Sequence, residues 1–123
     1  MTTSSQQNLN HTVIFHKIND FLCLWYQRSK RLPKLDRYTI GQKVFELLLE
    51  IVLLIVHAEY QSGDRKCYTL KTIAPKLDSI KILIRLARQI ETIDEKTYIR
   101  YESELQTIGR MLGGWIRSLT KNR

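Results

Sequence analysis

Basic side chains are the residues of this chain whose types and spacing most directly suggest a chemical role. The 123 residues include 20 Lys and Arg against 12 Asp and Glu, which gives a formal net charge of +8. The cations form three clusters: Arg28, Lys30, Arg31, Lys34 and Arg37; Lys81, Arg85 and Arg88; and Arg110, Arg117 and Lys121. Rows of cations on a helix can follow a phosphate backbone, and counterion release makes such binding salt-dependent. The clusters therefore predict a nucleic-acid partner, with a merely solvated basic surface as the alternative.

Aromatic side chains do not alternate with these cations in a way that predicts base stacking. We therefore expect the nucleic-acid backbone, rather than the base sequence, to be recognised.

Motifs for catalysis and metal binding receive little support. Glu46 and Glu50 share one side of a helix, but they lack the Glu-x-x-His partner found in di-metal bundles. His57 is better explained as a structural or interfacial residue. Cys23 and Cys67 form no CxxC motif, and no phosphate-binding glycine loop is present. We expect no enzymatic activity, no metal and no cofactor.

The segment 36–61 is expected to form the central helix of the fold. Between residues 44 and 58 every side chain is apolar except Glu46, Glu50 and His57, which share one narrow side of a helix. The apolar arc is then roughly 250° wide, whereas packing against one core needs about 100°. The segment is too short and too charged for a membrane span of about 20 residues. We expect the surplus apolar surface to contact another subunit, at Leu49, Val52 and Val56.

Apolar residues at helical spacing predict three further helices. The first covers residues 12–29 and the third covers residues 66–90. Pro75 either kinks the third helix or marks the first turn of a shorter one. Thr92 and Glu95 have the spacing of a capping box that opens the fourth helix, and Asp36 is the expected N-cap of the central helix.

The short connections between these helices leave neighbouring helices antiparallel. The predicted fold is all-α, an up-down-up-down four-helix bundle over residues 12–121. Residues 1–11 are rich in Ser, Thr, Gln and Asn without hydrophobic periodicity, which predicts a disordered tail. With no signal peptide and no disulfide framework, a cytoplasmic location is expected.

Glycines occupy unusual positions in the predicted helices. Gly41 near the start of the central helix costs about 1 kcal/mol relative to alanine. Gly113 and Gly114 either end the fourth helix or lie within it; the apolar stripe continues beyond them, which favours a helix that runs through. We expect Gly41, Gly109 and Gly113 to permit close approach of another backbone, with Trp115 as a packing anchor.

Three segments resemble one known family. They are residues 33–43 (PKLDRYTIGQK), the helix from Lys76-Leu77-Asp78 to Arg85-Leu86-Ala87, and residues 108–116 (IGRMLGGWI). Together they resemble the accessory variability determinant (Avd) family of diversity-generating retroelements over about residues 12 to 120. Related four-helix proteins encoded in rRNA intervening sequences share the architecture. They carry an Ala-Glu-Gly motif in the second helix, which this chain lacks.

The resemblance implies a four-helix bundle that assembles into a pentameric barrel. It also implies a barrel that binds a reverse transcriptase and its template RNA or cDNA during mutagenic copying. We therefore predict a non-catalytic accessory subunit that forms a ring or barrel homo-oligomer. The alternative is a structural oligomeric helical protein without a nucleic-acid function.

Overall fold

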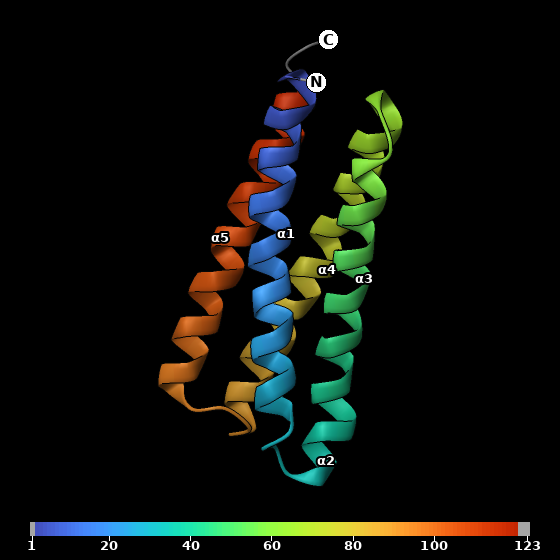
Figure 1. Ribbon diagram of the computed structural model, residues 1–123. Coiled ribbons are helices and arrows are strands. Elements are labelled where there is room, and N and C mark those ends of the chain that lie inside the picture. Colours follow the sequence, from blue (N-terminus) through green and yellow to red (C-terminus); the bar gives the residue numbers. More distant parts are fainter. Residues whose placement is uncertain (1, 121–123) are drawn as a thin grey trace.

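The fold is a bundle of four long helices. The computed structural model describes the backbone of residues 2–120 and the side chains of residues 13–120. The elements are α1 (Thr2–Ser29), α2 (Lys34–Asp36), a π-helix η1 (Arg37–Gly41), α3 (Gln42–Glu59), α4 (Gly63–Gln89) and α5 (Glu95–Thr120). The long helices run alternately up and down, with α1 beside α5 and α3 beside α4 (Figure 1). The predicted all-helical bundle is thereby confirmed.

Each long helix contributes a row of buried apolar side chains to one core. The rows include Ile14, Ile18 and Phe21 of α1, Val44, Leu48 and Ile51 of α3, Leu70, Ile73 and Ile80 of α4, and Leu105, Ile108 and Leu112 of α5. Tyr101 meets the rings of Phe21 and Trp25 edge-on, at centroid distances of 5.3 and 6.0 Å. Burial raises the pKa of Tyr101, so its phenol stays neutral in this core. Within residues 2–120, no helix has both the length and the apolarity needed to cross a bilayer.

The first helix begins earlier than the sequence suggests. α1 starts at Thr2, so the backbone of residues 2–11 is helical, where a disordered tail was predicted. Extending an existing helix avoids the cost of nucleation, and polar residues such as Ser, Thr and Asn lower helix stability by less than about 1 kcal/mol each. The packed domain was predicted to cover residues 12–121. Its two limits lie outside the described side chains and stay predictions.

Two predicted helix caps are wrong. The helical segment before α3 begins at Lys34, and the Asp36 carboxylate accepts a hydrogen bond from the Thr92 hydroxyl (3.0 Å) instead of capping a helix. Asp94 rather than Thr92 caps α5, because its carboxylate accepts the backbone N–H of Thr97 at 2.8 Å. The Thr92–Asp36 contact joins α2 to the α4–α5 connection at one end of the bundle.

The structure decides the alternatives left open at Pro75 and at the glycines. α4 is one helix from Gly63 to Gln89 with Pro75 inside it. α5 likewise runs through Gly113 and Gly114 to Thr120. The proline therefore does not start a shorter helix, and the glycines do not end one.

A π-helical turn leads into α3. Its last residue, Gly41, accepts a buried hydrogen bond from the Trp25 indole N–H at 2.9 Å. A Cβ at Gly41 would lie 3.1 Å from the carbonyl oxygen of Asp36. The close backbone neighbour of Gly41 is therefore a carbonyl of its own turn. The tryptophan bond ties this turn to α1.

Candidate nucleic-acid interface

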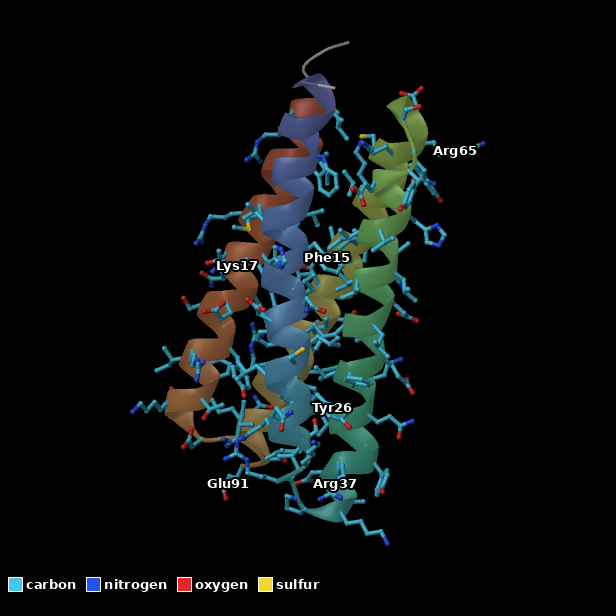
Figure 2. The ribbon with its side chains drawn as sticks, in the orientation of Figure 1. Phe15, Lys17, Tyr26, Arg37, Arg65 and Glu91 are labelled. Atoms are coloured by element: carbon cyan, nitrogen blue, oxygen red, sulfur yellow. The ribbon has the colours of Figure 1, made fainter. Side chains whose placement is uncertain are left out.

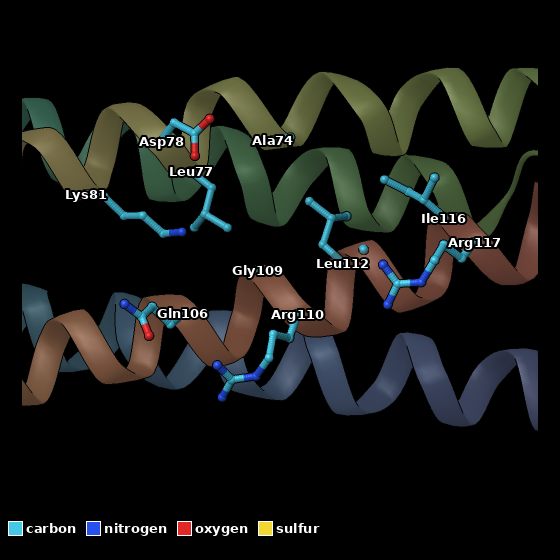
Figure 3. A pocket seen from close by; sticks show the side chains of 11 residues that line it. Ala74, Leu77, Asp78, Lys81, Gln106, Gly109, Arg110, Leu112, Ile116 and Arg117 are labelled. Carbon is cyan, nitrogen blue, oxygen red and sulfur yellow. The ribbon is translucent and has the colours of Figure 1, made fainter.

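A groove of about 600 Å³ lies between α4 and α5 (Figure 3). Three of its lining residues are predicted nucleic-acid contacts: Lys81 from α4, and Arg110 and Arg117 from α5. Asp78 is the carboxylate among the residues that line it. The fold therefore combines parts of the second and third basic clusters into one cationic groove, which we call the α4–α5 groove.

Glycines on α5 leave room for the charged tips in this groove. The Lys81 ammonium lies 3.6 Å from the position that a Cβ of Gly109 would occupy. Arg117 covers Gly113, with Nη1 at 3.2 Å from the corresponding Cβ position. Arg110 donates from Nη2 to the Thr107 hydroxyl at 3.2 Å. In Figure 3 the tip of Lys81 lies between α4 and α5 and Arg117 lies against α5, whereas the Arg110 guanidinium extends to the side of α5 away from α4.

The expected backbone contacts of Gly109 and Gly113 are not found within the described subunit. The atoms nearest their Cβ positions belong to the side chains of Leu77, Lys81 and Arg117. Trp115 is 5% exposed, so it packs in the core of its own subunit, where the Lys66 ammonium lies 6.0 Å from its ring centroid. Side chains of α4 fill the space opposite Gly109, and Arg117 of α5 itself covers Gly113.

The remaining cations of the second cluster differ in their surroundings. Arg85 is exposed one helical turn after Lys81. Arg88 is ion-paired with Glu95 and lies 5.3 Å from the ring centroid of Tyr98. Arg85 therefore extends the cationic row of α4, whereas the charge of Arg88 is largely balanced by a neighbour.

The first basic cluster is not one patch. The Arg37 guanidinium donates to the carbonyls of Ser29 (3.2 Å), Lys30 (2.8 Å) and Leu32 (3.3 Å), and so closes the end of α1.

Arg28, another member of the first cluster, acts on Asp94. Hydrogen bonds from Thr97 lower the pKa of Asp94, and the charges of Arg28 and Lys96 add to this effect.

The remaining predicted contacts of the first and third clusters lie outside the α4–α5 groove or outside the described residues. Arg31 and Lys34 are exposed, the latter at the start of α2. The Lys30 ammonium lies 4.8 Å from the ring centroid of Tyr26. Lys121 lies outside the described residues.

Two rows of apolar side chains remain uncovered on the bundle. On α3, Leu49 is 39% and Leu53 61% exposed, while Val52 and Val56 are half-buried; we call these four residues the α3 strip. Ile82 and Leu86 of α4, with the residue Ile90 that follows this helix, form the α4 strip, with exposures of 61%, 43% and 52%. The sequence predicts subunit contacts at Leu49, Val52 and Val56 of the first strip, and none in the second. The regular four-residue spacing of the α4 strip was its detectable signal.

The fold and the groove define a class: a four-helix-bundle protein with a cationic groove between two helices. Among the described residues, no three His, Cys, Asp or Glu side chains gather closely enough to hold a metal ion.

The family model described as bAvd-like matches residues 12–119, and the chain belongs to this family. Comparison with curated proteins returned no match, and comparison with solved structures returned none either. The family match confirms the resemblance to Avd proteins. It indicates an accessory, non-catalytic role in a diversity-generating retroelement.

Proposed function

We propose that this protein is a cytoplasmic, non-catalytic accessory subunit of a diversity-generating retroelement. It assembles into a five-subunit ring that binds the reverse transcriptase and the phosphate backbone of template RNA or cDNA. Family membership supports the accessory role. The observation that carries the nucleic-acid part is the α4–α5 groove, where Lys81, Arg110 and Arg117 outnumber Asp78.

The groove suits a phosphate chain better than a small neutral ligand. Its cations come from two neighbouring helices, and Arg85 continues the row on α4 toward the α4–α5 connection. Each cation that contacts a phosphate releases condensed counterions, so affinity falls as salt rises. Repetition of the groove around a ring offers several such surfaces to one strand, which raises the overall affinity.

The ring is supported by the two exposed strips. A closed ring joined head to tail needs two different, complementary surfaces on each subunit. The α3 strip and the α4 strip are separated by the polar side of α3, where Glu50 pairs with Lys76 of α4 at 3.2 Å. We propose that one strip of each subunit contacts the other strip of the next.

Charge reversal tests the proposed nucleic-acid interface. The variant Lys81→Glu/Arg110→Glu/Arg117→Glu should keep its helical content and oligomeric state. It should bind single-stranded RNA more weakly by a factor on the order of a hundred, because three phosphate contacts become repulsive. Fluorescence anisotropy with a labelled oligonucleotide measures this change.

The matched control reverses three exposed cations outside the groove, in Arg65→Glu/Lys96→Glu/Arg100→Glu. This variant has the same net charge as the groove variant. If both variants lose affinity equally, binding depends on net charge and the groove has no special role. If neither variant changes binding, the structural alternative is favoured.

A further inference from the structure

A second cavity, of about 400 Å³, lies where the end of α1 meets η1 and the first turn of α3. Three aromatic side chains line it: Tyr26, Tyr38 and Phe45. Figure 2 shows Tyr26 between α1 and α3, near the end of the bundle that carries Arg37. Tyr26 lies on α1, Tyr38 on η1 and Phe45 on α3, so three elements meet at this site. We call this site the aromatic cavity.

The two tyrosines of this cavity are exposed to solvent. Tyr38 is 61% and Tyr26 48% exposed, and the rings of Tyr26 and Phe45 are 5.7 Å apart at 42°. Two tyrosines kept in contact with solvent contribute less to the core than buried rings do. They offer flat apolar surfaces on which a planar ring can stack.

The polar groups of the cavity favour an anionic ligand that carries a hydrogen-bonding ring. Its lining includes the cations Lys30 and Arg37 and, among the described residues, no carboxylate. The Ser29 hydroxyl is buried at the wall without a hydrogen-bond partner in the described structure. The Gln42 amide also lines the cavity and is oriented by its bond to Glu46 at 3.0 Å.

The geometry points to a pocket for one nucleobase of a single-stranded nucleic acid. The base stacks on Tyr38, its edge faces Ser29 and Gln42, and Lys30, whose ammonium lies 4.8 Å from the Tyr26 ring centroid, contacts the adjoining phosphate. Arg37 is a positioning residue, because its guanidinium is held by three carbonyls at the end of α1. A volume of about 400 Å³ lies within the usual 300–1,000 Å³ of small-ligand sites.

This inference rests on the proposed nucleic-acid function and departs from the expectation of pure backbone recognition. It predicts that bases add affinity to what the phosphates supply. Tyr38 is the residue to change, since it is the most exposed of the three rings and its removal leaves the core intact.

The test compares a single-stranded oligonucleotide with an abasic one of equal length and equal charge. The oligomeric wild-type protein should bind the base-bearing strand roughly tenfold more tightly, the effect of one stacked base. Tyr38→Ala should lose this preference while keeping its salt dependence, and Tyr38→Phe should retain it. Tyr60→Ala is the control, because Tyr60 is a tyrosine that is 85% exposed and lies outside the cavity.

Three results would overturn the inference. The first is equal binding of both strands by the wild type while groove charge reversal still weakens binding. The proposed nucleic-acid function would then hold, and the base pocket would be ruled out. The second is an equal loss of affinity in Tyr38→Ala and Tyr60→Ala. The third is dissociation of the oligomer by Tyr38→Ala in light scattering, which would make the cavity a subunit contact.

Discussion

Glu91 has a strained backbone conformation at the C-terminal end of α4, and a substitution can relieve this strain. Its φ of 64° is left-handed, and it follows α4 in a Schellman arrangement with Thr92 N–H donating to Ala87 O and Glu91 N–H to Arg88 O. Glycine is the residue that this position favours. Glu91→Gly should raise the free energy of unfolding by about 0.5–1 kcal/mol in urea denaturation, because relief of the left-handed strain exceeds the added chain entropy. Glu91→Gln, which keeps the strain, should show no such gain.

Asp94 gives the chain a pH-dependent helix cap. Hydrogen bonds from Thr97 hold the pKa of Asp94 below its ordinary value, so the folded state binds this proton less readily than the unfolded state. Its contribution to stability is therefore complete above the unfolded pKa, about 3.9, and is lost as the pH falls through the folded pKa. The urea midpoint of Asp94→Ala should be below that of the wild type at neutral pH, and the gap should narrow under acid. The urea midpoint of Asp94→Asn should be close to that of the wild type, since asparagine also caps helices. A gap that is constant with pH would contradict this account.

At the scale of elements, Pro75 lowers the stability of α4. The proline removes one backbone hydrogen bond within the continuous helix Gly63–Gln89, and its ring crowds the preceding turn. Because Pro75 is exposed, Pro75→Ala should raise the free energy of unfolding by about 1–3 kcal/mol. Thermal unfolding followed by circular dichroism measures the change. An unchanged or lower melting temperature would show that the backbone around the proline is not strained.

The sequence predicts the long helices because their apolar spacing is regular, and it fails where distant residues decide. The π-helical turn at Gly41 depends on a hydrogen bond from Trp25, sixteen positions away. The cap of α5 is Asp94, which bonds to Thr97, whereas the Thr92 hydroxyl bonds to the distant Asp36 of α2. Residue types alone identified Lys81, Arg110 and Arg117 as candidate contacts, but only the pairing of α4 with α5 places them in one groove. Arg37 and Arg88 were identified by the same rule, yet their partners lie on other elements.

At the scale of the whole molecule, the two apolar strips predict how subunits join. Leu53→Glu places a charge in the α3 strip and Ile82→Glu places one in the α4 strip. Because either charge disrupts the contact between the two strips, each variant alone should be monomeric. Mixed together, they retain one intact pair of surfaces and should form a dimer, whereas the wild type should have five times the 14.6 kDa mass of the chain. Light scattering distinguishes these masses. A wild-type monomer, or a mixture that stays monomeric, would contradict the head-to-tail arrangement.

The salt dependence of nucleic-acid binding tests the central claim most directly, because it counts phosphates contacted. The wild type and Lys81→Gln/Arg110→Gln/Arg117→Gln are titrated with the same single-stranded RNA across a range of salt concentrations. If the α4–α5 groove holds the backbone, the slope of log K against log salt should be shallower in the variant by about 2, the share of three lost contacts on a single strand. Identical slopes and affinities in the two proteins would contradict the claim that the groove binds nucleic acid.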